Sequence, residues 1–395
     1  MGTIGRRNDC TATLAGCRRV RRREIMMADV NELRQRLDDI DARLIALVGE
    51  RQATIGEIAV AKRSTGSSLR DYKLEKEVFD KARANALKAG IAPRVAEDVL
   101  RPLIRYSLST QEQAAIGAHR VGNGQRALVI GGAGKMGAWF SQFLISRGFD
   151  VEIADPAAAS IAGAHTDWRL IRLDHDLIVV ATPLGSTNAV LGELADKRPK
   201  GVVFDLASLK SPLKSGLAQL RERGVRVTSV HPMFGPDVVL LSGRHIVFVD
   251  VGCAQATEYA RELFHPTMAA QVVMTLDEHD MSMAKVLGLS HAINIAFLST
   301  LDKLGSDATR LAQLSSTTFD SQFDTARRVA AENPQLYYEI QHLNPHSLAV
   351  LECLRNALED FVAAAQAKDG ALFRSTMDRC RRFARDRRRN GDREA

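Results

Sequence analysis

The fold at the centre of this 395-residue chain is decided by the stretch Ala127-Leu128-Val129-Ile130-Gly131-Gly132-Ala133-Gly134-Lys135-Met136-Gly137. A short apolar run, typical of a buried strand, leads into glycines at the spacing G-x-G-x-x-G, and a helical pattern follows. The next apolar run ends at Asp155, 18 residues beyond Gly137. Such glycines let the backbone approach a pyrophosphate at a helix N-terminus, while the acid can bind a ribose hydroxyl. The segment predicts a Rossmann βαβ unit whose nucleotide-binding residues are Gly132, Gly134, Lys135, Met136, Gly137 and Asp155.

The cofactor expected at these glycines is NAD. The carboxylate of Asp155 would hydrogen-bond the ribose 2′-hydroxyl and repel a 2′-phosphate, which favours NAD over NADP. Further apolar runs at 177–181, 201–206 and 225–230 alternate with helical patterns. Continuous apolar strands separated by helices are typical of a parallel sheet, so the whole region is expected to be an α/β domain.

The rest of the chain has helical patterns. Apolar residues recur at three- and four-residue steps over 29–62, and helices are expected at 71–89 and 94–113 and again beyond about residue 275. The fold class expected is therefore multidomain, with a three-helix module, a Rossmann domain and an all-α C-terminal dimerisation domain. The predicted boundaries are a disordered basic extension 1–27, a helical domain 28–116, a linker 117–125, a Rossmann domain 126–274, a helical domain 275–385 and a basic tail 386–395.

The net charge of +7 belongs to the chain ends. Residues 1–25 and 379–395 are rich in arginine, so the remainder is slightly acidic. Neither end has interleaved aromatic residues, and no nucleic-acid partner is expected. No apolar run is expected to be long enough to span a bilayer, so no membrane partner is expected. The five cysteines are scattered and form no CxxC pair, which indicates a reducing cytoplasm and no metal site.

A second motif, His231-Pro232-Met233-Phe234-Gly235-Pro236-Asp237, places a histidine at the end of the run 225–230. Ligands in open α/β sheets bind outside the carboxyl ends of the strands. A histidine there can take a proton while a hydride leaves the same carbon. The motif after a Rossmann half resembles the prephenate dehydrogenase family, and the resemblance implies that His231 is the catalytic base.

The same resemblance implies further residues of the dehydrogenase site. Thr182, in Val180-Ala181-Thr182-Pro183, matches a position that orients the histidine, and Asp205 to Lys210 match a D-x-x-S-x-K segment. His279 matches a histidine position for which a structural role is expected. Three further residues match positions that bind the substrate: His291, Arg328 and Tyr337. Arg328 matches the arginine that binds a substrate carboxylate.

The N-terminal helices resemble the all-α chorismate mutases that are found fused to prephenate dehydrogenase or dehydratase. The resemblance implies that Lys62 and Gln111 stabilise charge on the ether oxygen of chorismate. It implies that the substrate is held by Arg34, Arg51, Asp71, Glu75 and Ser107. Arg51 and Lys62 are 11 residues apart and share one helix face, whereas Arg34 lies off that face, as expected if it reaches the partner's site.

One residue departs from this pattern. Leu74 stands where the mutase family usually has an arginine, three residues after Asp71. The chain is predicted to be a homodimeric, cytoplasmic enzyme that converts chorismate to prephenate and oxidises prephenate with NAD. Two alternatives stay open: a dehydrogenase for arogenate or 4-amino-4-deoxyprephenate, and a degenerate mutase module that serves dimerisation or metabolite sensing.

Overall fold

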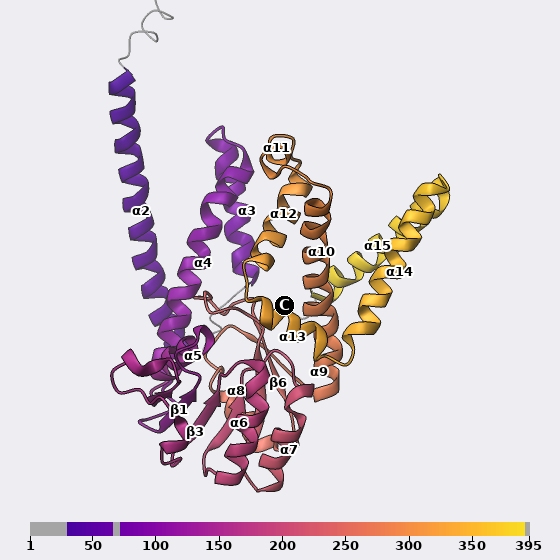
Figure 1. The fold of residues 1–395 in the computed structure, drawn as a ribbon. Coiled ribbons are helices and arrows are strands. Elements are labelled where there is room, and N and C mark those ends of the chain that lie inside the picture. Colours follow the sequence, from indigo (N-terminus) through magenta and orange to yellow (C-terminus); the bar gives the residue numbers. More distant parts are fainter. Residues whose placement is uncertain (1–29, 66–71, 392–395) are drawn as a thin grey trace, which may run out of the picture. The chain divides into compact units, whose positions relative to one another are not determined.

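The computed structural model describes residues 30–65 and 72–391, and Figure 1 shows their fold. For residues 62–65, 72 and 386–391 only the helical backbone is described. The predicted extension 1–27 and the predicted site residue Asp71 lie outside the described residues. The described chain divides into two compact units, one of residues 30–65 and 82–107 and the other of residues 72–81 and 108–391.

The three predicted N-terminal helices are present. They are α2 (Val30–Thr65), α3 (Tyr72–Lys88) and α4 (Pro93–Ala118). Helix α3 ends because Gly90 takes a left-handed conformation, with φ of 72°, and the amide of Ile91 turns back to the carbonyl of Ala86. Pro93 then occupies the first position of α4, where its missing N–H costs no helical hydrogen bond.

The last turns of α4 belong to the second unit. Ile116 packs in the core of the sheet domain, and the Glu112 carboxylate accepts hydrogen bonds from the amides of Leu241 (2.7 Å) and Met268 (2.5 Å). The fully buried Arg147 donates to the carbonyls of Ile116 (3.1 Å) and His119, at the end of this helix. These contacts explain why a boundary between the units falls inside α4 and not at residues 117–125.

The second unit contains a seven-stranded sheet with the order β2-β1-β3-β4-β5-β6-β7. Its strands are β1 (Arg126–Ile130), β2 (Asp150–Ala154), β3 (Leu177–Val180), β4 (Val202–Asp205), β5 (Val227–Pro232), β6 (His245–Val249) and β7 (Ala270–Met274). Strands β1 to β5 are parallel, as predicted. The sequence did not predict β6, which is antiparallel to β5, or β7, which is parallel to β6.

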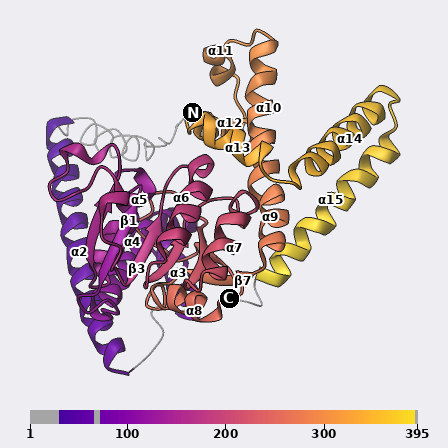
Figure 2. The same cartoon turned by 60° about the horizontal axis from the view of Figure 1, so that its bottom comes forward.

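Helices cover both faces of this sheet, as Figure 2 shows. Ala127 and Val129 of β1 point to one core with α5 (Lys135–Ser146) and α8 (Ala254–Glu262), and Leu128 and Ile130 point to the other. The second core is covered by α6 (Leu184–Lys197) and α7 (Lys214–Glu222). Three short 3-10 helices connect these elements: η1 (Ala158–Ser160), η2 (Trp168–Leu170) and η3 (Ser211–Leu213).

The C-terminal part is helical throughout, which confirms the expected fold class. Its elements are α9 (Leu276–Met283), the π-helical η4 (Ala284–Leu289), α10 (Ser290–Lys303), α11 (Ala308–Gln313), α12 (Thr317–Ala330), α13 (Pro334–His342), α14 (Ser347–Gln366) and α15 (Gly370–Gly391). Helix α15 continues into the segment predicted as a basic tail.

The helical stretch Leu276–Lys303, formed by α9, η4 and α10, is long and apolar enough to cross a membrane by length and composition alone. The expectation that no segment has this length was therefore wrong. A single such helix is weak support for a membrane span, because the core helices of globular domains pass the same test. Near the start of the stretch, in α9, the side chains of His279 and Asp280 are buried against the sheet domain.

Candidate active sites

The glycine loop between β1 and α5 has no room for side chains. Gly131 has φ of 87°, and a Cβ there would lie 2.6 Å from the carbonyl oxygen of Ala181. A Cβ on Gly137 would lie 2.1 Å from the carbonyl oxygen of Gly131. Helix α5 starts at Lys135, and its N-cap, Gly134, provides no side-chain cap. Its first amides are therefore left for an anion, and the loop fits the pyrophosphate of a dinucleotide.

Asp155 lies beside this loop, at the end of β2. Its carboxylate accepts hydrogen bonds from the amides of Ala133 (3.2 Å) and Ala157 (2.8 Å). The loop also lies at the switch point of the sheet, where β1 separates β2 from β3. In open α/β sheets this is the position of a bound ligand. The predicted nucleotide residues are thus brought together by one strand-loop-helix unit and the strand next to it.

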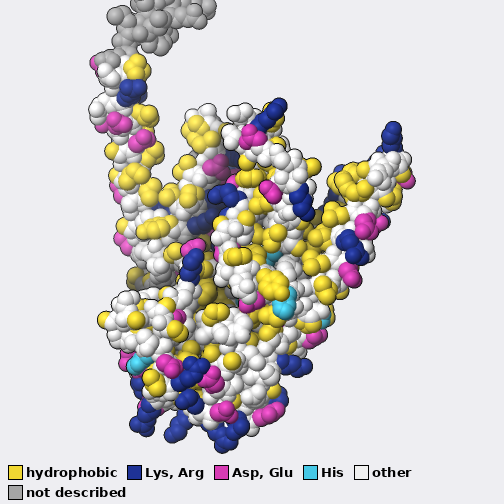
Figure 3. Space-filling model, in the orientation of Figure 1, with side chains coloured by type: hydrophobic (Ala, Val, Ile, Leu, Met, Phe, Trp, Pro, Cys, Tyr) yellow, Lys and Arg dark blue, Asp and Glu magenta, His cyan; other side chains and the backbone are white. Residues whose placement is uncertain are grey.

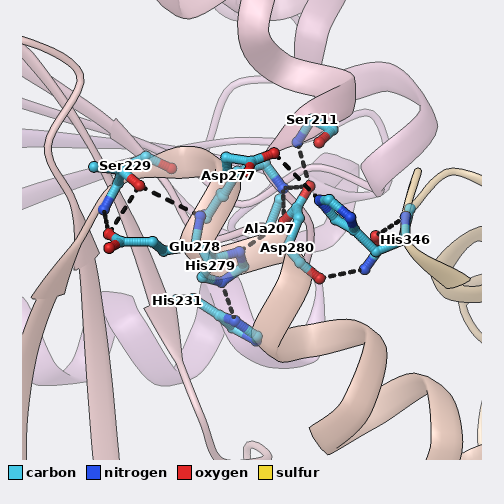
Figure 4. Close-up of polar contacts among 12 residues, drawn as sticks. Ala207, Ser211, Ser229, His231, Asp277, Glu278, His279, Asp280 and His346 are labelled. Atoms are coloured by element: carbon cyan, nitrogen blue, oxygen red, sulfur yellow. Dashed lines mark hydrogen bonds and ion pairs between the residues drawn. The ribbon is translucent and has the colours of Figure 1, made fainter. Parts of the chain in front are cut away.

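His231 lies within β5, near its carboxyl end, and is 4% exposed. Its Nδ1 is 2.9 Å from Nε2 of His279, and Nδ1 of His279 is 2.7 Å from Oδ1 of Asp280 (Figure 4). Burial, with smaller contributions from His279 and Lys210, lowers the pKa of His231 well below 6.5. A histidine with a lowered pKa is neutral near pH 7 and can accept a proton.

A buried ion pair lies next to these histidines. The ammonium of Lys210 is 2.7 Å from Oδ1 of Asp205 and also donates to the carbonyl of Val230 (3.0 Å). The other oxygen of Asp205 accepts from the hydroxyl of Ser229 at 2.5 Å. Burial lowers the pKa of Lys210, and the nearby carboxylates partly oppose this. The D-x-x-S-x-K segment therefore ties the ends of β4 and β5 together beneath His231.

Among the described residues, no hydrogen bond joins Thr182 to His231. Its hydroxyl lies 2.9 Å from that of Thr187, while a Cβ on Gly131 would lie 2.9 Å from the amide of Thr182. Thr182 thus stands beside the glycine loop, at the end of β3. The partner that the structure gives His231 is His279, for which sequence reasoning expected only a structural role. Sequence holds one signal for it, the adjacent Asp280, because a histidine beside an acid can have its tautomer set by that acid.

His291 stacks on Tyr337, with ring centroids 4.2 Å apart and an interplanar angle of 27°. The Nδ1 atom of His291 is buried and has no hydrogen-bond partner among the described residues. Burial also lowers the pKa of this histidine. Two predicted substrate residues from α10 and α13 therefore lie together, and one of them carries a buried polar atom that no described residue satisfies.

Arg327 and Arg328 are both exposed on α12. The guanidinium of Arg328 donates to the carbonyl of Asp324 (3.3 Å), and that of Arg327 lies 3.8 Å from the Asp324 carboxylate. Within the described chain, no hydrogen bond or ion pair joins either arginine to His231, His291 or Tyr337. The predicted carboxylate clamp is therefore not assembled by these contacts.

Two predicted mutase residues are brought together in the first unit. Arg51 of α2 donates to the hydroxyl of Ser107 on α4 at 2.7 Å, and that hydroxyl is 2.9 Å from the amide oxygen of Gln52. Ser107 is buried, and Arg51 also donates to the carbonyl of Leu103 (3.3 Å). Gln52 is a residue that sequence reasoning missed, although it adjoins Arg51.

The other predicted mutase residues fall on both sides of the division between the two units. Arg34 is exposed on the N-terminal half of α2, and the side chain of Lys62 lies outside the described part of the chain. Gln111 is buried and Glu75 is half-buried, and both belong to the second unit. Leu74, which replaces the usual arginine, is 47% exposed.

Comparison with known families assigns most of the chain. Residues 33–112 match chorismate mutase type II, residues 143–272 match the nucleotide-binding domain of prephenate dehydrogenase, and residues 275–379 match its dimerization domain. The second match begins beyond the glycine loop, so the assignment of that loop rests on its geometry and position in the sheet.

Known proteins resemble either nearly the whole chain or a large part of it. The chain is 25% identical over 365 residues to the T-protein of Enterobacter agglomerans, which covers 91% of this chain and 94% of that protein. It is 28% identical over 263 residues to the 4-amino-4-deoxyprephenate dehydrogenase of Streptomyces pristinaespiralis, covering 63% of this chain and 87% of that protein.

A solved structure of prephenate dehydrogenase from A. aeolicus superposes with a TM-score of 0.50 and 16% identity, over 66% of this chain and 98% of that one. The fold, the order of the domains and the match along nearly the whole length of a T-protein agree. The chain therefore joins a type II chorismate mutase domain to the two domains of prephenate dehydrogenase, and belongs to the bifunctional chorismate mutase–prephenate dehydrogenases of tyrosine biosynthesis.

Proposed function

We propose that His231 is the base of the dehydrogenase site and that the mutase domain supplies its substrate, prephenate. The observation that carries this proposal is the placement of a buried histidine near the carboxyl end of β5, in the same sheet as the glycine loop. We also propose that the mutase domain spans residues 28–116, the nucleotide-binding domain residues 126–274 and the C-terminal helical domain residues 275–385.

The chemistry requires one acceptor for a proton and one for a hydride. His231 removes the proton of the C4 hydroxyl of prephenate. The glycine loop and Asp155 would hold NAD, which would supply the acceptor for the hydride from the same carbon. The ring then loses CO2 and becomes aromatic, which yields 4-hydroxyphenylpyruvate. His291 and Tyr337 line the substrate side, and Arg328 binds a substrate carboxylate through a bidentate contact.

The mutase reaction needs no proton transfer, only cations and donors that hold chorismate in a reactive conformation. Arg51 and Ser107 are already joined by a hydrogen bond of 2.7 Å and form one side of this site. Lys62 and Gln111 stabilise the charge on the ether oxygen, and Asp71 and Glu75 bind the remaining polar groups of the substrate.

We further propose a homodimer in which α2 packs against a second copy. Six apolar side chains of α2 recur at steps of three and four residues and are between 42% and 59% exposed: Val30, Leu33, Leu37, Ile40, Leu44 and Leu47. Figure 3 shows hydrophobic side chains along this helix. A repeat of this kind is the seam by which helices pair. Arg34 lies on the same half of the helix, where a partner's site can use it.

We propose that the enzyme is cytoplasmic. The cysteines that the structure describes, Cys253, Cys353 and Cys380, are free thiols, which suits a reducing compartment.

Replacing Asp155 should change the choice of cofactor. Asp155→Asn and Asp155→Ser are expected to weaken NAD use by roughly 10- to 100-fold, because a charge-assisted hydrogen bond to the ribose is lost. The kcat/KM with NADP should rise, because Asp155 no longer repels the 2′-phosphate of NADP. The measurement is kcat/KM for both nucleotides with prephenate. Asp150→Ser, an exposed change at the start of the same strand, is the matched control, and a wild type that prefers NADP would contradict the assignment.

Replacing Arg328 should weaken substrate binding. Arg328→Ala is expected to raise the KM for prephenate by roughly 10- to 150-fold with little change in the NAD dissociation constant, because one ionic hydrogen-bond clamp is lost. Arg327→Ala is the control, one residue away on the same exposed helix. If Arg327→Ala shows the effect and Arg328→Ala does not, the carboxylate is bound one residue earlier in the sequence.

The whole proposal is tested by supplying purified protein with chorismate and NAD and following NADH and CO2. We expect equal amounts of both products, with prephenate accumulating when NAD is omitted. Arogenate and 4-amino-4-deoxyprephenate should then be compared with prephenate by kcat/KM. One relative of this chain is named as a 4-amino-4-deoxyprephenate dehydrogenase. A higher value for either would replace prephenate as the dehydrogenase substrate, while no turnover of chorismate would mean that the helices serve only as a dimerisation module.

A further inference from the structure

The feature that goes beyond these roles is a buried chain of hydrogen bonds that starts at His231. It runs from Nδ1 of His231 to Nε2 of His279 (2.9 Å) and from Nδ1 of His279 to Asp280 (2.7 Å). It thereby joins β5 of the nucleotide-binding domain to α9 of the C-terminal region (Figure 4). His279 and Asp280 are each 0% exposed, so neither can exchange its partner for water.

Asp280 is held as a carboxylate. Its oxygens accept from the backbone amides of Lys210 (2.9 Å) and Ser211 (2.6 Å) as well as from His279. Burial alone would raise the pKa of Asp280, but the hydrogen bonds from His279, Ser211 and Lys210 lower it. An ionised carboxylate can only accept hydrogen bonds, so the proton between Asp280 and His279 sits on Nδ1 of His279.

The position of this proton on His279 determines the positions of the protons on the other ring nitrogens of the hydrogen-bonded series. Burial lowers the pKa of His279, so its ring is neutral and its Nε2 carries a lone pair. The hydrogen bond between the two rings must then be donated by Nδ1 of His231. The Nε2 atom of His231 is left with its lone pair, and it has no hydrogen-bond partner among the described residues. This is the atom that can receive the proton of the substrate.

We infer that His279 and Asp280 are positioning residues that hold the base, His231, as the tautomer with a free lone pair on Nε2. This inference rests on the proposed role of His231. When His231 takes the hydroxyl proton at Nε2, the new positive charge is shared along the hydrogen bond to His279 and faces the carboxylate of Asp280. The other charged groups around the two rings, Lys210 and Asp205, neutralise each other at 2.7 Å.

The sharpest test is Asp280→Asn. The amide nitrogen of asparagine can donate to Nδ1 of His279, which moves the proton of that ring to Nε2. His231 must then accept at Nδ1 and carry its proton on Nε2, where it blocks proton removal. We expect kcat for prephenate oxidation to fall by about 10²–10⁴, as for a triad whose acid is replaced by its amide, while KM for prephenate and for NAD changes little.

A second pair of variants separates the hydrogen bond from packing. His279→Gln retains an acceptor for His231 Nδ1 and should keep more activity than His279→Leu, which has none. The dissociation constant for NAD of the same preparations reports whether the nucleotide-binding domain, which His279 contacts through His231, is folded. If both variants are equally slow, or if His279→Leu and Asp280→Asn keep wild-type kcat, the inference is wrong.

The tautomer itself can be read by ¹H–¹⁵N spectra of protein labelled at histidine, with the signals of His231 assigned by their absence in His231→Asn. In the wild type, Nδ1 of His231 should carry the proton and Nε2 should be unprotonated. In Asp280→Asn, Nε2 of His231 should carry the proton and Nδ1 should be unprotonated. A wild-type His231 with its proton on Nε2 would overturn the inference. Failure of the proposed function looks different, because His231→Asn would then also retain activity.

Discussion

His231→Asn should reduce prephenate oxidation by about 10²–10⁴ in kcat, the usual contribution of a positioned general base. Asparagine can still form a hydrogen bond with His279, but it cannot accept a proton at neutral pH. The measurement is NADH formation from added prephenate, alongside NAD binding and mutase turnover, both of which should stay near wild type. His245→Asn, an exposed histidine at the start of the neighbouring strand β6, is the matched control. Near wild-type oxidation by His231→Asn would contradict the assignment of His231 as the base.

The pH dependence of the wild type belongs to the same prediction. Burial, with the nearby His279 and Lys210, lowers the pKa of His231 well below 6.5. The base is neutral above its pKa and protonated below it, so oxidation should persist through neutral pH and be lost as the pH falls below 6.5 through this lowered pKa. This acid limb should be absent from the residual activity of His231→Asn. A limb that lies above 6.5 in the wild type would contradict the assignment.

Arg51→Ala is expected to lower the conversion of chorismate to prephenate by roughly 10²–10³, the effect of removing one preorganised donor from a developing charge. The variant also loses the hydrogen bonds that Arg51 makes to Ser107 and to the carbonyl of Leu103. Oxidation of added prephenate should be unchanged, because the dehydrogenase residues lie in the other unit. Arg43→Ala, an exposed arginine on the same helix, is the control.

Mixing variants tests whether the mutase site is shared between subunits. Arg34→Ala and Arg51→Ala subunits should regain part of the lost activity when they are dissociated and reassembled together, because a mixed dimer contains one intact site. No recovery would mean that Arg34 serves its own subunit. A wild type without any mutase activity would mean that Leu74, in place of the usual arginine, had already removed the function.

The strongest sequence predictions concerned residues whose chemistry depends on near neighbours in the chain. The glycine loop and Asp155 are linked by one strand-helix-strand unit, and each step of it has a local signal. The three N-terminal helices were predicted by periodicity, and their bounds in the structure differ by a few residues at most ends. The sequence did not predict β6, which pairs antiparallel, or β7, which lies at the sheet edge and has no buried residue.

The partner of His231 could not be deduced from sequence, because 48 residues separate it from His279. Sequence reasoning gave the orienting role to Thr182 and expected His279 to be structural, whereas in the structure Thr182 bonds Thr187. The pairing of Arg51 with Ser107 spans 56 residues and also depends on how two helices pack.

By itself, the sequence determined that this chain has a dinucleotide-binding sheet, a histidine near the end of one of its strands and flanking helical domains. These features follow from local periodicity and from the few conformations that glycine-rich turns allow. Only the tertiary structure decided which acid reaches which histidine, and therefore where each proton sits. That outcome depends on α9 packing against the start of η3, beyond β4, and against the carboxyl end of β5, a long-range contact that no local pattern encodes.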